Sequence, residues 1–258
     1  PVKDYVPLAL SDEFVVTQYT MTSLEELGLL KMDFLGLKTL TVISDAEKAV
    51  KEIEPSFDIE NIPLDDTETY EIFATGQTFG VFQFESAGMR SVLARIKPEN
   101  LEDLIAVISL YRPGPMDSID TYIQNRRNPQ KTAYKSDKLK PILSVTHGCM
   151  IYQEQVMQVF RELAGYSYGR ADIVRRAMSK KKHDVMEKER VTFIEGASRN
   201  GIEPAAANSI FEDMSSFASY AFNKSHAAAY SLVAYRTAWL KCHYPAQFMA
   251  ALLTSVLD

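Results

Sequence analysis

Cysteine and tryptophan are nearly missing from this sequence of 258 residues, which has two cysteines and one tryptophan. Cys149 and Cys242 each lack a second cysteine nearby in the chain. Disulfide frameworks and cysteine-based zinc sites use recurring, closely spaced cysteines, so we expect neither here. Such sparse cysteine use favours a reducing, cytoplasmic setting.

Long apolar runs are missing as well. No uninterrupted run approaches the roughly 20 residues that a helix needs to cross a bilayer. The first residues, PVKDYVPLAL, lack an initiator methionine and the basic-then-apolar order of a signal peptide, which is consistent with a fragment of a longer protein. Because 46% of the residues are hydrophobic and 24% are charged, we expect a soluble globular chain with a substantial core and no membrane partner.

The motifs of the common hydrolases give little support for that class. HExxH does not occur, and the one match to GxSxG is the short stretch GYSYG, residues 165–169, which on its own is a weak signal. Its four histidines, His147, His183, His226 and His243, do not have the spacing of metal ligands. We therefore do not expect a hydrolase or a zinc enzyme.

Charge is unevenly distributed along the chain. The formal net charge is −6, which by itself argues against a nucleic-acid partner. Residues 126–190, however, contain 15 lysines and arginines against 7 aspartates and glutamates. Composition leaves two interpretations open for this basic segment: a solvated, lysine-rich helix face, or a surface that binds nucleic acid.

Hydrophobic periodicity predicts a mainly α protein with a small mixed α/β part at its N-terminus and a boundary near residue 40. Residues 14–20 have the β-branched and aromatic bias of a strand, and 78–86 look strand-like too. The basic stretch 122–143 is expected to be loop-rich. Helices are predicted over 40–54, 68–76, 86–97, 101–111, 152–165, 168–201, 204–221, 225–244 and 245–257, the first stopped by Pro55 and the third by Pro98.

The stretch AFNKSHAAAY, residues 221–230, combines a lysine and a histidine with the start of a small-residue helix. Ser225 is predicted as the N-cap of that helix. Asn223, Lys224 and His226 would then lie at the positive end of the helix dipole, where anions bind. A phosphate is the predicted ligand.

Further cations of the kind that hold polyphosphate lie along the chain. Phosphoryl transfer depends on metal ions and basic side chains that neutralise developing charge, and needs little covalent chemistry from the protein. If these residues form one helix, Arg175 and Ser179 lie on one side of it because they are four positions apart. Arg176 and Lys180 lie along a second stripe of the same helix, about 100° around the axis from the first. One stripe can face a nucleotide while the other faces a nucleic-acid backbone.

Six motifs occur in the order in which they are found in one family: GLLKMDFLGLKTL, GVFQFESAGM, LYRPGPM, YQEQVMQ, ADIVRRAMSKKK and FNKSHAAAYSLVAYRTAWLKCHYPAQFMAALL. Over essentially its whole length the chain resembles the α subunit family of bacterial DNA polymerase III, the C family of replicative polymerases. The resemblance implies the last part of a palm domain over residues 1–40, followed by most of a helical fingers domain over residues 41–258.

The resemblance also implies a catalytic metal ligand. Family members hold two Mg²⁺ ions with three palm aspartates, and the third of these matches Asp33, which we expect at the end of a packed strand. The other two belong to an Asp-x-Asp element that these residues do not contain. The two-ion site would be completed by aspartates outside the chain, which alone is expected to be inactive.

Other family sites map onto the fingers part. We expect Arg175 and Arg176 to clamp the triphosphate, with at most one of them paired to Asp172, and His226 to act as steric gate against a ribose 2′-hydroxyl. Ala221 replaces a glycine expected just ahead of FNKSH. Gln83 and Phe84 are candidates for the same pocket, with a core role as the alternative for Phe84, and Trp239, Tyr235 and Phe248 are expected in the core. The implied nucleotide-binding residues are Gln83, Ser109, Arg112, Gly114, Arg175, Arg176, Lys180, Asn223, Lys224 and His226, and the implied DNA-binding residues are Arg126, Arg127, Lys181 and Lys182.

The function implied for the intact protein is primer extension with deoxynucleoside triphosphates on template-primer DNA. The sliding clamp, the proofreading exonuclease subunit and the clamp loader are the implied protein partners, through regions outside this chain. Two alternatives remain: a noncatalytic nucleic-acid-binding module, whose DNA binding would not respond to triphosphate, and a protein-interaction scaffold without a ligand. The sequence does not distinguish a main replicase from an error-prone paralogue.

Overall fold

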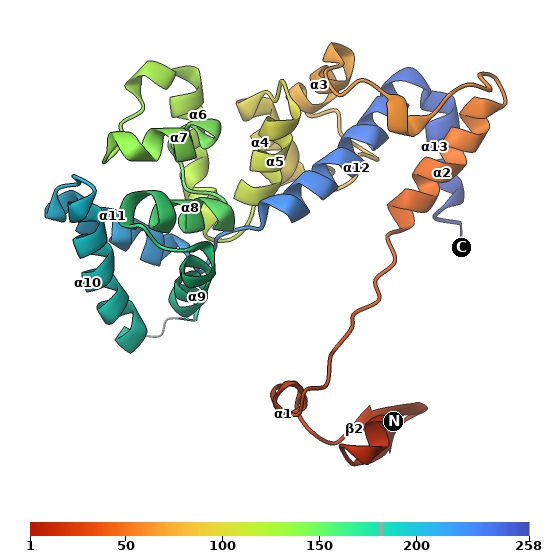
Figure 1. Cartoon of the computed structure of the whole chain (residues 1–258). Coiled ribbons are helices and arrows are strands. Elements are labelled where there is room, and N and C mark those ends of the chain that lie inside the picture. The colour runs from red at the N-terminus through yellow and green to blue at the C-terminus, as the bar shows by residue number, and fades with distance from the viewer. Residues whose placement is uncertain (181–182, 258) are drawn as a thin grey trace. The chain divides into compact units, whose positions relative to one another are not determined.

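The computed structural model describes residues 1–180 and 183–257, and for His183 only the backbone (Figure 1). The chain divides into two compact units, Pro1–Lys38 and Thr39–Asp258. Within the described residues, no helix combines the length and hydropathy that crossing a membrane requires. The fold class is confirmed: a short two-stranded sheet near the N-terminus is followed by a helical unit.

The first unit is built around a hairpin. Strands β1 (Leu8–Ser11) and β2 (Phe14–Thr17) pair in antiparallel register, with Ser11 opposite Phe14. A 3₁₀ turn, Val2–Asp4, precedes them and the helix α1, Met21–Glu26, follows. The strand predicted over 14–20 is therefore present, but ends at Thr17. Its partner β1 was not predicted, because LALS is too short to show an alternating pattern.

The segment that carries Asp33 differs from the prediction. Residues 29–37 form neither helix nor strand. The Asp33 side chain is 66% exposed and its nearest cation is Lys31, at 3.3 Å, while Phe34 and Leu35 are 90% and 93% exposed. A packed strand at Asp33 is thus wrong for this structure. A strand needs a neighbour to pair with, and the two strands of the first unit pair with each other.

The second unit contains the helices that periodicity predicts, with the one over 168–201 divided into α9 and α10, and two that were not predicted, α6 and α7. They begin with α2 (Lys38–Lys51), α3 (Thr67–Ala74), α4 (Ala87–Ile96), α5 (Leu101–Leu110) and α6 (Ile119–Arg127). They continue with α7 (Lys140–Leu143), α8 (Gln153–Ala164), α9 (Tyr168–Ser179), α10 (His183–Arg199), α11 (Pro204–Phe217), α12 (Lys224–His243) and α13 (Pro245–Thr254). Short 3₁₀ turns lie at Ile59–Asn61, Pro115–Ser118, Pro129–Lys131, Asp137–Leu139 and Ser144–Thr146.

Side-chain caps explain where several helices begin. Asp66, Ser86 and Asn100 are the N-caps of α3, α4 and α5, and each accepts a hydrogen bond from the backbone N–H three residues later. These bonds satisfy donors that have no partner inside the helix. At the other end of α8, Gly165 has the left-handed conformation (φ 75°) that commonly ends a helix.

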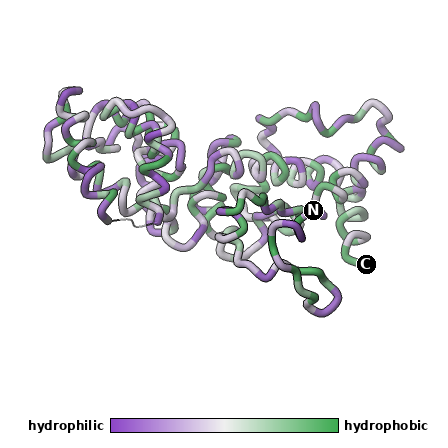
Figure 2. Tube along the Cα trace, turned by 60° about the horizontal axis from the view of Figure 1, so that its bottom comes forward, coloured by the Kyte–Doolittle hydropathy of each residue, from purple (hydrophilic) through white to green (hydrophobic). Residues whose placement is uncertain are grey.

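Two hydrophobic clusters form the interior of the second unit. The first lies among α2–α6, α12 and α13 and contains Phe84, Tyr235 and Phe248, so the core roles of these three residues are confirmed. The second lies among α7–α11, around Phe160 and neighbouring aromatic rings. Trp239 is only partly buried, at the margin of the first cluster, where it stacks on Phe57 with ring centroids 5.6 Å apart. Hydrophobic and hydrophilic residues alternate along the helical tubes (Figure 2), as expected where each helix buries one face.

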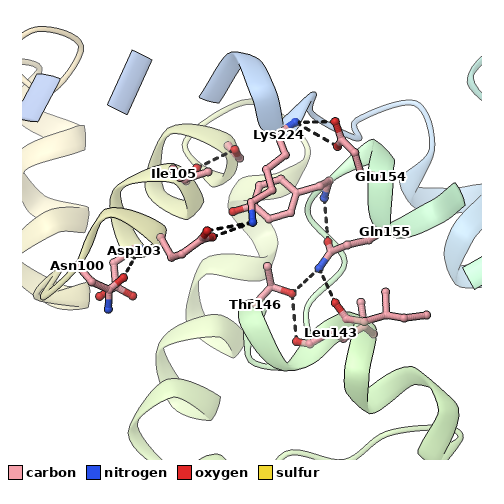
Figure 3. Close-up of polar contacts among 12 residues, drawn as sticks. Asn100, Asp103, Ile105, Leu143, Thr146, Glu154, Gln155 and Lys224 are labelled. Atoms are coloured by element: carbon pink, nitrogen blue, oxygen red, sulfur yellow. Dashed lines mark hydrogen bonds and ion pairs between the residues drawn. The ribbon is translucent and has the colours of Figure 1, made fainter. Parts of the chain in front are cut away.

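A backbone bridge connects α8 to the start of α12. The N–H of Phe222 donates to Ile151 and the N–H of Gln153 donates back to Phe222, at 3.1 and 2.8 Å. The buried Gln155 side chain fixes this segment from inside: its Oε1 accepts from the N–H of Ile151 and Tyr152, and its Nε2 donates to Thr146 (Figure 3). The N-terminus of α12 is thereby placed beside α8.

Two further predictions are corrected here. Residues 78–86 form turns instead of a strand, because Gly80 (φ 77°) and Gln83 (φ 65°) have left-handed backbones that no strand accommodates. The buried hydroxyl of Thr78 donates to the Phe84 carbonyl and closes the turn. The basic stretch 122–143 is more helical than predicted, since α6 extends to Arg127 and α7 begins at Lys140.

Candidate functional site

The N-terminus of α12 is capped by Asn223. Its side-chain oxygen accepts from the N–H of His226 at 2.8 Å, and the helix begins at Lys224. Ser225 as N-cap is therefore wrong. Asn223 is preferred because Phe222, held in the bridge to α8, brings the chain into the extended conformation that a cap needs just before the helix.

A cavity of about 400 Å³ lies against this end of α12. Three of the predicted nucleotide-binding residues line it: Gln83 from the turn before α4, Arg112 from the turn after α5, and His226. Its size falls in the range of small-molecule sites. The other residues that line it are Ser86, Met89, Ile108, Tyr111, Phe222 and Tyr230.

The cavity combines one cation with a row of rings. The Arg112 guanidinium lies 4.4 Å from the centre of the Phe222 ring, Phe222 meets His226 edge to face at 5.4 Å, and His226 lies 4.1 Å from Tyr230. No carboxylate of the described residues forms an ion pair with Arg112, which leaves its charge available to an anion. Flat rings suit a planar ligand and a guanidinium suits a phosphate.

Carboxylates already satisfy the positive end of α12. Glu154 of α8 accepts from the backbone N–H of Lys224 with both oxygens, each at 3.1 Å, and from the Asn223 amide. The Lys224 ammonium lies 2.9 Å from Glu102 of α5 and 5.3 Å from the centre of the Tyr152 ring (Figure 3). The predicted anion position at this helix end is thus filled by a protein carboxylate in this structure.

Arg175 and Arg176 lie on α9, and neither lines the cavity. Both pair with Asp172, at 2.7 and 2.8 Å, so the expectation that at most one would do so is wrong. Positions three and four residues along a helix lie on the same side, which puts both guanidinium groups within reach of one carboxylate. The hydrogen bonds and positive charge of the two arginines, Arg175 first, lower the pKa of Asp172.

Most of the remaining predicted residues contact other parts of the protein and do not line the cavity. Ser109 is fully buried and its hydroxyl donates to the Ile105 carbonyl at 2.8 Å. Arg126 is paired with the buried Asp103 at 2.8 Å, and Arg127 donates to the Arg95 carbonyl at 3.1 Å. Lys180 is exposed at the end of α9, whereas Lys181 and Lys182 lie outside the described residues.

Gly114 lies in a separate place. Its backbone has φ 99°, and a Cβ on it would come within 2.3 Å of the Tyr220 ring. It lines a second cavity of about 430 Å³ together with Tyr220, Tyr134 and Phe217, which does not include Arg112. The turn RPGP therefore presents Arg112 to one cavity and Gly114 to the other.

Several residues around the candidate site were missed by sequence reasoning. Tyr230 lies one helical turn after His226, a spacing that could have predicted the contact between their rings. Phe222 directly precedes the cap residue and could have been found from that position. Glu102 and Glu154 gave no signal, because they reach α12 from helices about 120 and 70 positions earlier in the chain.

Family models match both units. The model described as the bacterial DNA polymerase III alpha subunit finger domain matches residues 39–201, and the one described as the bacterial DNA polymerase III alpha NTPase domain matches residues 1–36. The chain therefore belongs to the bacterial DNA polymerase III alpha subunit family.

Named relatives agree with this assignment. The chain is 50% identical to the DNA polymerase III subunit alpha of Thermus aquaticus over 261 residues, which cover 98% of this chain and 21% of that protein. It is 50% identical to the protein of the same name from Borreliella burgdorferi, covering 100% and 23%, and 49% identical to that from Staphylococcus aureus strain COL, covering 100% and 24%. The chain thus spans less than a quarter of the length of these relatives.

Proposed function

We propose that the chain is the nucleotide-binding part of a DNA-directed DNA polymerase, which extends a primer when its 3′-hydroxyl attacks the α-phosphate of a deoxynucleoside triphosphate and releases pyrophosphate. The observation that carries the proposal is the cavity in which Arg112, without a carboxylate partner among the described residues, faces the rings of Phe222, His226 and Tyr230. The rings would contact the base or sugar and the guanidinium the phosphates.

The domain assignment belongs to the same proposal. Residues 1–40 would be the end of the palm and 41–258 most of the fingers. The family's activity at a triphosphate implies divalent metal ions, for which Mg²⁺ is our proposal. Asp33 fits as one ligand, because its exposed carboxylate is a hard oxygen donor, but one carboxylate cannot hold two ions. We expect the remaining aspartates outside this chain and no polymerisation by the chain alone.

To bind the triphosphate, the lysine and arginines of the site would exchange their carboxylate partners for its phosphates. Lys224 is held by Glu102, and Arg175 and Arg176 by Asp172, all through partly solvent-exposed contacts that a triphosphate can replace. A polyphosphate offers these cations more negative charge than one carboxylate does. Lys180 of α9 would support the same phosphates, and Asn223 would position Lys224 and His226 by capping α12. Ser109 and Gly114 would act through the backbone on either side of Arg112.

Template and primer contacts are proposed for the basic residues outside the cavity. Arg127, Lys181 and Lys182 are the candidates, with Arg126 acting as an internal support for that region. Binding of this kind depends on salt, because each phosphate contact releases counterions. The sliding clamp, the exonuclease subunit and the clamp loader would bind elsewhere in the intact protein, which we expect in the bacterial cytoplasm.

Calorimetric titration of the chain with a deoxynucleoside triphosphate and Mg²⁺ tests the site. We expect saturable binding that Arg112→Gln weakens by about ten- to a hundredfold, since hydrogen bonds to charged groups contribute about 1.5–3 kcal/mol. Arg161→Gln is the matched control: this exposed arginine also lies over an aromatic ring, Tyr168, at 4.6 Å, but outside the cavity.

Equal affinities of the wild type and both variants would contradict the cavity assignment. A double variant, Arg175→Ala with Arg176→Ala, separately tests the α9 clamp. Salt-sensitive DNA binding that is the same with and without triphosphate, in the chain and in the intact polymerase, would support the noncatalytic binding module instead.

A further inference from the structure

Three side chains of different chemistry meet far from the proposed nucleotide cavity. Among the described residues, Asp66, Cys242 and His243 form the one group in which at least three such ligand atoms lie within 4.8 Å of one another. Asp66 caps α3, whereas Cys242 and His243 are the last two residues of α12. Sequence spacing excluded a zinc site because it compares neighbours along the chain, and these residues come together only in the fold.

Hydrogen bonds from Thr69 hold the aspartate of this group in place. Its Oδ2 accepts from the N–H of Thr69 at 2.9 Å and from the Thr69 hydroxyl, and it lies 2.9 Å from Nε2 of His243. Thr69 is fully buried. Metal sites commonly orient their carboxylate ligands through such second contacts, which keep the oxygen aimed at the ion.

The two elements that carry the group are also fixed to each other. The hydroxyl of Tyr235, two turns before Cys242 on α12, donates to the Pro63 carbonyl at 2.7 Å and accepts from the N–H of Asp66 at 3.2 Å. The ring of His243 lies 4.6 Å from that of Trp239 on the same helix. The ligands therefore need little rearrangement, since the segment before α3 is already tied to α12.

We propose that Asp66, Cys242 and His243 bind one divalent transition-metal ion, with Zn²⁺ as the best fit. Zinc accepts sulfur, nitrogen and oxygen donors at about 2.0–2.3 Å in tetrahedral geometry. Donor atoms within 4.8 Å of one another reach that geometry by side-chain rotation. The thiolate disfavours Mg²⁺ and Ca²⁺, which take oxygen ligands. With three protein ligands, the fourth position is open to water, and the ion joins α3 to the end of α12. This site is independent of the metal ions of the proposed polymerase reaction.

Cobalt titration tests the proposal directly. Co²⁺ replaces Zn²⁺ in such sites, and a cysteine ligand gives a thiolate-to-cobalt charge-transfer band. The tag-free chain, treated with a chelator, would be titrated as wild type and as Cys242→Ser, Asp66→Asn and Cys149→Ser. Asn retains the helix cap, so Asp66→Asn removes the carboxylate ligand without unfolding α3. Cys149 lies outside the group, so Cys149→Ser is the matched control for the loss of a thiol.

We expect one Co²⁺ per chain and a charge-transfer band that is the same in wild type and Cys149→Ser but missing in Cys242→Ser. Asp66→Asn should weaken binding by at least about tenfold, the loss seen even for outer-shell partners. Zn²⁺ should displace the cobalt and raise the melting temperature of the wild type and of Cys149→Ser, but not of Cys242→Ser. No band in a folded wild type, or a band that Cys242→Ser retains, would overturn the proposal.

Discussion

The ammonium of Lys224 lies 2.9 Å from the carboxylate of Glu102, which comes from a helix more than a hundred residues earlier. Lys224 is the first residue of α12, where the helix dipole and its own charge favour an anion. The carboxylate therefore takes a position that our proposal gives to a triphosphate, and the two would compete.

Replacement of this carboxylate should strengthen triphosphate binding. In Glu102→Gln the lysine no longer has a charged partner to release, and partly exposed ion pairs contribute about 0.2–1 kcal/mol, so we expect an affinity gain of up to about fivefold. Calorimetry on the same preparation measures it. Glu162→Gln, which removes a carboxylate 3.4 Å from Arg161 on α8, is the control. A loss of affinity in Glu102→Gln would mean that Glu102 positions Lys224 for its ligand.

Arg126 should contribute to stability more than to DNA binding. Its guanidinium pairs with Asp103, which is 4% exposed, and donates to the Ile96 carbonyl at 2.9 Å. Removal of one partner of a buried pair leaves an uncompensated charge and costs about 3–5 kcal/mol. We expect Arg126→Met to lower the free energy of unfolding in urea accordingly.

The neighbouring Arg127 is the comparison for that experiment. It is exposed, and Arg127→Gln should change stability by no more than about 0.5 kcal/mol. If Arg126→Met instead leaves the free energy of unfolding unchanged and weakens DNA binding, a stabilising role of the pair between Arg126 and Asp103 is contradicted.

Gly114→Ala should be costly for two separable reasons. A residue with a Cβ is strained at φ 99°, and that atom would lie 2.3 Å from the Tyr220 ring. Gly165→Ala provides the strain alone, since it has φ 75° and nothing within 4 Å of an added Cβ. In denaturant unfolding, we expect the free energy of unfolding to fall by about 1 kcal/mol in Gly165→Ala and by about 2–4 kcal/mol in Gly114→Ala. Removal of the ring in Tyr220→Ala should make Gly114→Ala less destabilising, because the added Cβ no longer meets the ring. If the effects of Gly114→Ala and Tyr220→Ala on the free energy of unfolding are additive, the contact is contradicted.

The two thiols should differ in reactivity. Burial raises the pKa of Cys149 from 9.0 to about 11, so at pH 8 its thiolate fraction is about a hundredfold below that of an ordinary thiol. Burial raises the pKa of Cys242 too, but this thiol is only partly buried, so iodoacetamide at pH 8 on the chelator-treated chain, followed by peptide mass spectrometry, should label Cys242 first. Because the folded pKa is the higher one, the neutral Cys149 thiol stabilises the fold below about pH 9, and this contribution is lost as the pH rises towards 11. A Cys149 that reacts as fast as Cys242 would contradict its burial.

Local sequence signals were sufficient for most of the helical unit. The predicted helix α4 begins after Ser86 and ends before Pro98, where a capping side chain and a proline act on their immediate neighbours. The cap of α3 is equally local, since Asp66 accepts from the N–H of Thr69 three residues later. The prediction failed at residues 78–86, where Val81 and Phe84 are buried within a closed turn, and backbone φ rather than hydropathy decides the structure.

The candidate site was less predictable than the fold. Gln83, Arg112 and His226 were named and share a cavity, but their grouping depends on how α4, α5 and α12 pack. The carboxylates that pair with the site's lysine and arginines were harder still to predict. Asp172 was considered for one arginine and holds both, whereas Glu102 and Glu154 lie far along the chain, where charge pairing leaves no periodic signal.

The hydrogen-bonded bridge between Ile151–Gln153 and Phe222 makes residues 154–221 an insertion in the topological sense. The chain contributes α7 to the second hydrophobic cluster before the bridge, builds α8–α11 after it, and returns to the first cluster beyond Phe222. Both ends of this excursion lie side by side, so a short peptide would reconnect them. The arginines of α9 are therefore carried on a segment that begins and ends beside the residues that form the cavity.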